Sequence, residues 1–80
     1  MDKKLYELVH LARKALKSCH YSRAEKLIKQ FHLEALKSKD AEIIELATYA
    51  LIECRRFHFL SVLHELERID PIQSLRKELS

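Results

Sequence analysis

The chain has 80 residues and a mass of 9.5 kDa, which is enough for one domain but not for two. Hydrophobic residues make up 48% and charged residues 34%, a balance that can build a core and that argues against a wholly disordered chain. Glycine is absent and Pro71 is the single proline. The sequence therefore excludes glycine-rich phosphate loops and disfavours a β-sandwich or a β-barrel.

The net charge of +3 hides an uneven distribution of charged residues. Residues 1–39 contain ten basic and four acidic residues, whereas residues 40–80 contain five basic and eight acidic ones. A basic face can meet nucleic acid, an acidic protein or the acidic part of a second copy, or it can remain a solvated helix surface. Two cysteines are too few for a disulfide scaffold, and no apolar run is long enough to span a membrane. We therefore expect a cytoplasmic protein without a membrane partner.

The first half of the chain predicts two helices with a break near residues 19–21. Apolar residues recur there at spacings of three and four, the pattern of a helix with one buried face. In the first helix these residues are Leu5, Leu8, Val9, Leu11, Ala12, Ala15 and Leu16, and in the second they are Ala24, Leu27, Ile28, Phe31 and Ala35. Ser22 and Glu25 have the spacing of a capping box, which predicts the start of the second helix at Ser22.

The second half predicts two longer helices and a short fifth one. Asp40 suits the N-cap of a third helix. Arg55 and Arg56 suit its end, because the helix dipole favours basic residues at a C-terminus. A fourth helix is expected from about residue 57 to residue 68. Asp70 followed by Pro71 is a typical helix start, and it predicts a terminal cap helix over about residues 71–79.

The sequence matches itself at an offset of 35 residues, between residues 7–31 and 42–66. Six pairs are identical: Glu7 and Glu42, Leu11 and Leu46, Ala12 and Ala47, Ala15 and Ala50, Leu16 and Leu51, and Cys19 and Cys54. A fixed period of this size is typical of stacked units of one supersecondary structure, here a helix–turn–helix. The match also predicts small buried cysteines in place of a turn glycine at both Cys19 and Cys54.

These units resemble the tetratricopeptide repeat. Its pattern is carried by Leu8, Leu11, Ala12, Ala15, Tyr21, Ala24 and Ile28, and then by Ile43, Leu46, Ala47, Ala50, Leu63, Leu66 and Pro71. The resemblance implies an all-α fold of two stacked helix–turn–helix repeats in a single domain, followed by the cap helix. The first repeat would cover about residues 5–39 and the second about residues 40–70. A generic antiparallel helical bundle made by duplication is the alternative fold.

The resemblance also implies a function in protein–protein interaction, because the first helices of such units line the ligand-facing side. By position, this face would hold Tyr6, Val9, Arg13, Lys17, Ile44, Thr48 and Ile52. An apolar floor with a basic rim would accept an amphipathic helix or an acidic peptide of a partner. The other interpretation is that these residues bury against each other or against the fifth helix.

A narrower role follows from a second likeness. Small cytoplasmic chaperones of bacterial type III secretion systems are similar in size and use this fold to shield a helix of a secretion-system subunit. The likeness implies an adaptor or chaperone that holds a segment of its partner. Two repeat units bury little core by themselves, so we also expect that the chain forms homo- or hetero-oligomers.

Catalytic, metal and cofactor sites find little support in the sequence. The five histidines and two cysteines do not form the closely spaced ligand pairs of a zinc site. Cys19 and His20 are adjacent, and adjacent side chains on a helix point apart, which disfavours a thiolate–imidazole pair. We therefore predict that the protein is not an enzyme and needs no metal and no cofactor.

A small basic regulator that binds nucleic acid is the alternative function. Its candidate contacts lie on the first helical hairpin and are Lys14, Arg23, Lys26 and Lys29. Such residues would give a salt-dependent affinity for phosphates that is blind to base sequence.

Overall fold

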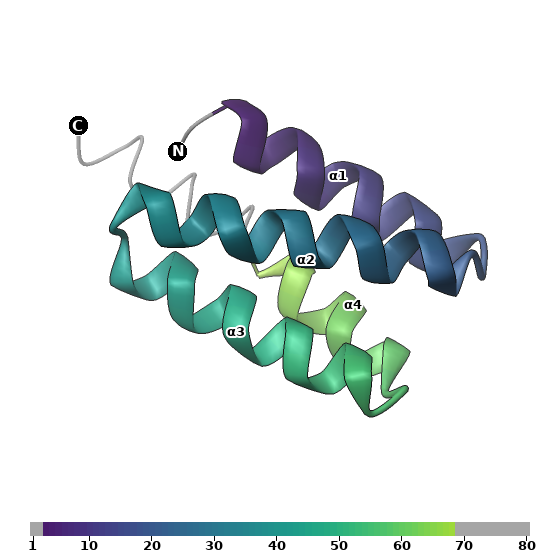
Figure 1. Cartoon of the computed structure of the whole chain (residues 1–80). Coiled ribbons are helices and arrows are strands. Elements are labelled where there is room, and N and C mark those ends of the chain that lie inside the picture. Colours follow the sequence, from purple (N-terminus) through teal and green to yellow (C-terminus); the bar gives the residue numbers. More distant parts are fainter. Residues whose placement is uncertain (1–2, 69–80) are drawn as a thin grey trace.

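The computed structural model describes residues 3–68, which form four α-helices: α1 (Lys3–Lys17), α2 (Tyr21–Ser38), α3 (Ala41–Arg55) and α4 (Phe59–Glu67). These residues include no strand, so the predicted all-α class is confirmed. Helices α1 and α2 form one hairpin and α3 and α4 form a second (Figure 1). The predicted cap helix over residues 71–79 lies outside the described part of the chain.

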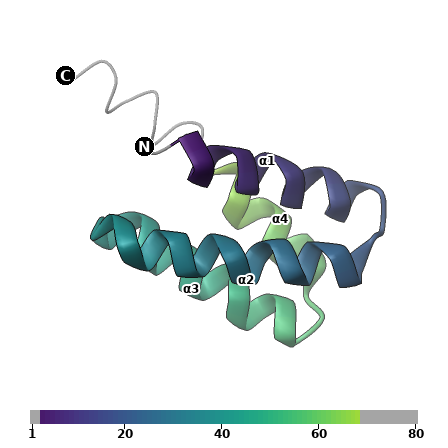
Figure 2. The ribbon, with the colours of Figure 1, turned by 45° about the horizontal axis from the view of Figure 1, so that its top comes forward.

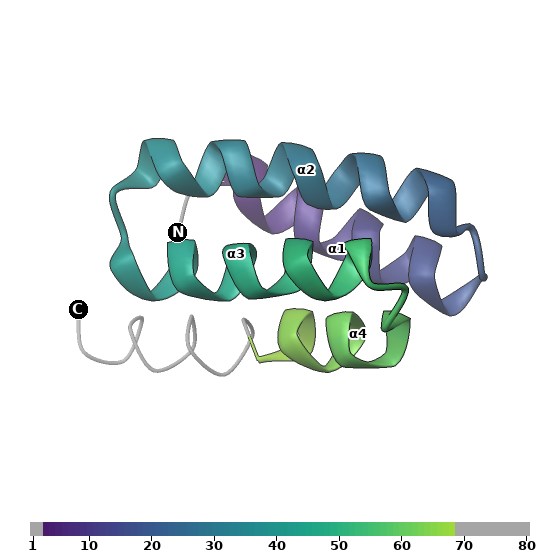
Figure 3. The same ribbon diagram turned by 60° about the horizontal axis from the view of Figure 1, so that its bottom comes forward.

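The two hairpins pack together around one core. Each helix contacts the next one along the chain, and α4 also contacts α1 (Figure 2). As a result α1 and α3 lie diagonally opposite each other across the core. The turns at residues 18–20 and 56–58 lie together at one end of the molecule, which we call the turn end (Figure 3). The link between α2 and α3 lies at the opposite end.

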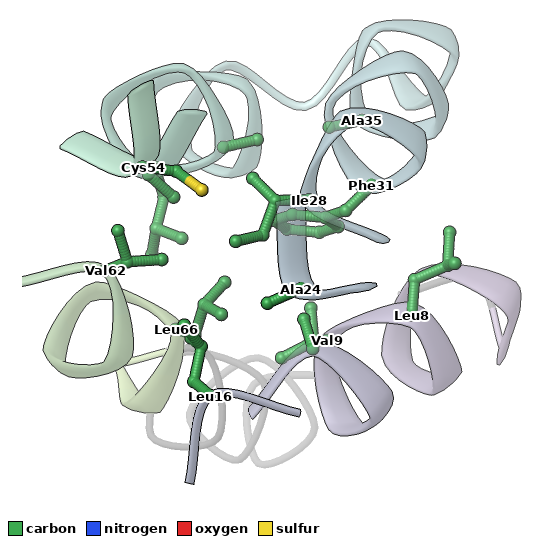
Figure 4. Close-up of a cluster of buried hydrophobic side chains, with 14 of the residues drawn as sticks. Leu8, Val9, Leu16, Ala24, Ile28, Phe31, Ala35, Cys54, Val62 and Leu66 are labelled. Carbon is green, nitrogen blue, oxygen red and sulfur yellow. The ribbon is translucent and has the colours of Figure 1, made fainter. Parts of the chain in front are cut away.

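The core is a continuous cluster of apolar side chains from all four helices (Figure 4). Phe31 and Ile28 of α2 and Leu66 of α4 are completely buried within it. Burying one such side chain stabilises the fold by about 1.5–3 kcal/mol relative to leaving it exposed. The apolar stripes predicted for α1 and α2 supply this core, apart from Leu11, which is 40% exposed, and Leu27, which is partly buried.

The two hairpins are equivalent at an offset of 38 residues, not the 35 inferred from identical pairs. At 38 every buried position of α1 matches a buried position of α3, and Ala24 and Ile28 match the buried Val62 and Leu66. At 35 the exposed Leu11 would be equated with the buried Leu46. Three residues are close to one helical turn, so a slip of three leaves much of an apolar stripe in register.

The same geometry closes both hairpins at the turn end. The His20 N–H donates to the Ala15 carbonyl at 2.9 Å, and the His58 N–H donates to the Glu53 carbonyl at 2.9 Å. The residue before each histidine is left-handed, with φ of 60° at Cys19 and 63° at Phe57. This is the Schellman arrangement, whose left-handed position favours glycine. Cys19 takes that position as predicted, but it is exposed, so its predicted burial is wrong. Cys54 is buried as predicted, but Phe57 and not Cys54 takes the turn position in the second hairpin.

The helix ends follow the sequence in part. The Asp40 carboxylate accepts a hydrogen bond from the Ile43 N–H at 3.5 Å, so its predicted N-cap role is confirmed, and α3 ends at Arg55 as expected. The predicted start of α2 at Ser22 is wrong, because α2 begins at Tyr21 with His20 as its N-cap. The carbonyl of His20 accepts the first helical bond, from the Ala24 N–H at 2.9 Å. The Schellman turn therefore fixes this boundary ahead of the capping box.

Candidate functional site

A hollow runs along the face of α1 that is turned away from the core. It has a volume of about 480 Å³ and is lined by Tyr6, His10, Arg13, Lys14 and Lys17. Four of these residues are spaced by four, three and four, so they share one stripe of the helix surface. Lys14 and Lys17 lie in the last turn of α1, where the helix dipole favours positive charge. The hollow therefore combines an aromatic side chain with several cations.

Three of the seven residues predicted to contact a partner lie in this α1 hollow, namely Tyr6, Arg13 and Lys17. The prediction for Val9 is wrong: its side chain is 1% exposed and packs in the core. Val9 lies on the inward stripe because α1 is contacted from two sides, by α2 and by α4. Sequence spacing alone could not tell these two sides apart.

The predicted residues of α3 do not join the α1 hollow, because α1 and α3 are diagonal neighbours. Ile44 is partly buried and packs against the core, whereas Ile52 is 48% exposed on the outer surface. Thr48 bridges two helices: its hydroxyl donates to the Ile44 carbonyl at 2.8 Å and lies 3.2 Å from Nε2 of His32 on α2. The predicted apolar floor of Ile44 and Ile52 therefore does not lie in the hollow that holds Tyr6, Arg13 and Lys17.

The basic residues proposed for nucleic acid fall into two groups. Lys14 and Arg23 line a second hollow of about 250 Å³ together with Leu11, Ala15, Ser18 and His20. Lys26 is exposed on α2, and Lys29 forms an ion pair with Glu25 at 3.4 Å. Lys14, which was predicted as a nucleic-acid contact only, borders both hollows.

Comparisons with protein-family models, with curated proteins and with solved structures found no match. The candidate sites are therefore judged on geometry and chemistry alone.

An exposed aromatic cluster at the turn end was missed in the sequence. Tyr21 and Phe59 stack with ring centroids 4.0 Å apart, and Phe57 meets Phe59 edge-on at 6.1 Å. Phe57 is 76% exposed, and so is Leu60 on the first turn of α4. A hydrogen bond with the Cys19 side chain, followed by its charge and by slight burial, raises the pKa of Tyr21. The available signal was Phe57 directly after Arg55 and Arg56, but the predicted fourth helix included it, whereas α4 begins at Phe59.

A carboxylate–imidazole pair stabilises the second turn. Oε2 of Glu53 lies 2.7 Å from Nδ1 of His58, and Oε1 lies 3.9 Å from the Arg56 guanidinium. The Glu53 side chain is nearly buried, so these contacts supply the partners that a buried charge needs. Ala15 holds the equivalent place in the first hairpin, next to a turn of the same backbone shape. The turn can therefore form without the carboxylate–imidazole pair.

A third hollow, of about 490 Å³, lies between α3 and α4 at the end away from the turns. It is lined by Glu42, Glu45, Leu46, Tyr49, Glu65 and Arg68. Arg68 pairs with Glu65 at 3.1 Å, and the lining holds three carboxylates against one guanidinium group. We call it the acidic hollow.

The described residues, 3–68, hold neither a membrane-spanning helix nor a cluster of metal ligands. None of the four helices is both long and apolar enough to cross a membrane. No group of three or more His, Cys, Asp or Glu side chains in this part of the chain is placed to hold a metal ion. Burial raises the pKa of the Cys54 thiol. The negative charge of Glu25 raises this pKa further, and the positive charge of Lys29 lowers it by a smaller amount.

Proposed function

We propose that the protein is a non-catalytic interaction module that holds an acidic peptide or the acidic side of an amphipathic helix along α1. The observation that supports this function is the α1 hollow, in which Tyr6 lies beside Arg13, Lys14 and Lys17. The tyrosine ring offers apolar contact area, and the cations suit carboxylates spaced along one face of a peptide. The hollow differs from the groove expected from sequence, because it uses α1 without α3.

The finer assignment is an adaptor or chaperone with tetratricopeptide-like helical hairpins that works in the cytoplasm, for example on a secretion-system subunit. Its support is the helix–turn–helix unit, which occurs twice in the described residues. Fold-level likeness of this kind is weaker support than the chemistry of the hollow.

The decisive experiment compares a double variant within the α1 hollow with a double variant on α2 outside it. The full chain carries Tyr6→Ala with Lys17→Glu in one variant, and Arg23→Glu with Lys26→Glu in the other. Each variant and the wild type are used to capture partners from the native host. The wash contains nuclease and only about 0.1 M salt, because higher salt would screen the charge pairs on which the proposed binding depends. We expect a protein bound stoichiometrically to the wild type and to the Arg23/Lys26 variant, and lost from the Tyr6/Lys17 variant. Equal binding to all three would refute the α1 hollow as the site.

A second candidate function is supported by the hollow that Lys14 and Arg23 share. We propose nucleic-acid binding there as the alternative, with Lys26 extending the basic surface along α2. Phosphate contacts weaken steeply as salt rises, whereas contact with an aromatic ring does not. Recovery of nucleic acid by the wild type, and its loss in the Arg23/Lys26 variant, would favour this alternative. Binding of a short labelled single-stranded nucleic acid to the purified protein, measured at two salt concentrations, tests the same alternative.

A further inference from the structure

The second hairpin exposes a large apolar side chain where its backbone favours glycine. Phe57 has φ of 63°, and a bulky residue in this region is sterically disfavoured. Its ring is nevertheless 76% exposed to solvent. Cys19 forms the same turn in the first hairpin with a small side chain, so the turn itself does not need a ring. The protruding Phe57 costs stability in the free chain, which points to a use outside it.

The charges beside Phe57 define what could receive it. Arg55 and Arg56 precede it in the sequence, and both are exposed. Glu53 is the nearest acidic residue in the sequence. It is nearly buried against His58, and its carboxylate also lies 3.9 Å from the Arg56 guanidinium, which leaves Arg55 without an acidic contact in the described residues. A complementary surface therefore needs an apolar recess for the ring and carboxylates for the two guanidinium groups.

The acidic hollow at the other end of the same hairpin has these properties. Its volume of about 490 Å³ exceeds that of a phenyl ring, and its lining includes Leu46 and the half-exposed Tyr49. Glu45 lies on the exposed side of α3 at its edge and is the carboxylate on which the contact depends. Glu42 also lines the hollow, and Glu65 pairs there with Arg68 at 3.1 Å. Figure 3 shows that α3 and α4 run side by side between the turn at residues 56–58 and this region. A single copy cannot bring its own Phe57 to its own hollow, because the two lie at opposite ends of the hairpin.

We propose that the occupant of the acidic hollow is a second copy of this chain. The Phe57 ring of one copy enters the hollow between α3 and α4 of another, and Arg55 and Arg56 face its carboxylates. Contact between two turn ends is disfavoured, because it would bring the arginines of both copies together. The contact joins unlike surfaces, so it either closes reciprocally between two copies or continues as a chain. It uses the second hairpin and is independent of the function proposed for α1.

Such a contact is small and charged, so we expect it to be weak, reversible and sensitive to salt. Sedimentation velocity of the full chain over a range of concentrations measures it directly. The mean mass should rise with concentration at about 50 mM salt and fall towards that of one chain at about 500 mM salt. A limiting mass of two copies indicates reciprocal closure, whereas a steadily rising mass indicates an open series of copies. Either result supports the proposed contact.

Two variants that each lose one half of the contact make the test specific. Phe57→Gly removes the ring and leaves the hollow intact, whereas Glu45→Lys alters the hollow and leaves the ring. Each variant alone should associate at least about tenfold more weakly than the wild type, since one ring or one charge pair in a small contact is worth about that factor. Mixed in equal amounts, the two should form a complex of one copy of each.

The first hairpin supplies matched controls at the equivalent positions, Cys19→Gly and Glu7→Lys. Both should associate like the wild type, and circular dichroism should show that all four variants keep their helices. A wild type that stays monomeric at every concentration in low salt would overturn the proposal. So would a mixture of Phe57→Gly and Glu45→Lys that forms no complex, or controls that lose as much association as the test variants.

Discussion

The two hairpins of this protein share one backbone arrangement and differ in the side chains at their turns. At an offset of 38 residues the turns have matching left-handed residues, matching hydrogen bonds and a histidine at the same place, His20 and His58. Every buried position of α1 is matched by a buried position in α3. The comparison shows that the pattern of buried residues and the turn geometry are common to both hairpins, whereas the exposed residues differ.

The differences lie where the side chains meet solvent. Cys19 of the first turn is replaced by the protruding Phe57, and the small Ala15 by Glu53, which pairs with His58. The outward stripe of α1 is basic, whereas α3 carries Glu42 and Glu45. The first hairpin thus presents cations and the second presents a ring and carboxylates. Both of our proposals depend on this divergence.

The largest expected effect comes from shortening equivalent side chains that the two hairpins contribute to the one core. Ile28 and Leu66 are equivalent and completely buried. Replacing either by alanine should lower the free energy of unfolding by about 2–5 kcal/mol, because a cavity remains. Urea denaturation followed by circular dichroism should show one transition, shifted to lower urea in both variants. Two separate transitions would mean that the hairpins are independent and not one core.

An intermediate effect is expected from giving the first turn the buried carboxylate that the second turn has. Ala15→Glu places a carboxylate at a site that is 5% exposed, five residues before His20, as Glu53 stands before His58. If His20 pairs with it, the single variant should lose less stability than the double variant Ala15→Glu with His20→Ala. The double variant should lose about 1–3 kcal/mol, the cost of an unpaired buried polar group. Equal losses in urea denaturation would show that the histidine does not respond.

A smaller effect on stability is expected at the left-handed residues of the two turns, Cys19 and Phe57. Cys19→Gly should raise the free energy of unfolding by about 1 kcal/mol, because glycine adopts φ of 60° without steric cost. Phe57→Gly gains the same relief but loses its edge contact with Phe59, so its stability should stay within about 1 kcal/mol of the wild type. Thermal melting checks both, and a lower melting temperature for Cys19→Gly would contradict the strain argument.

The smallest effect concerns an ion pair found between helices of the first hairpin. Partial burial of Glu34 raises its pKa, but hydrogen bonds from Lys37 and Lys4 outweigh that effect and hold it below the ordinary 4.5. A lowered pKa in the folded state stabilises the fold above pH 4.5, and the gain is lost as the pH falls through the folded value. Glu34→Gln should therefore cost some stability at neutral pH and none in acid. Glu7→Gln is the exposed control, and an equal loss at both pH values would contradict the assignment.

Much of the described fold could be predicted from local pattern. The apolar spacing gives four helices, and Asp40 and Arg55 mark the limits of α3. The start of α2 was misplaced at Ser22, since a Schellman turn depends on hydrogen bonds back to Ala15 and Leu16, which no local capping signal reports. The repeat was found at a neighbouring offset, because identical residues do not reveal which of them face inward.

The candidate site was predictable only in part. Tyr6, Arg13 and Lys17 could be grouped because they share a stripe of one helix, and the structure places them in one hollow. Val9 and Ile44 were assigned to the same surface, but their true surroundings depend on which helices flank α1 and α3. The exposed Phe57 was missed because an apolar residue in sequence gives no sign that it protrudes.

By itself, then, the sequence determined the helices, the duplicated unit and the uneven charge, because these follow from spacing and composition along the chain. The tertiary structure decided which stripes are buried and which cations share a hollow. It also decided that α1 meets α4 and that the acidic hollow lies at the end opposite Phe57. The physical reason is that contacts between helices depend on how four amphipathic faces close around one core, and spacing within one helix leaves this choice open.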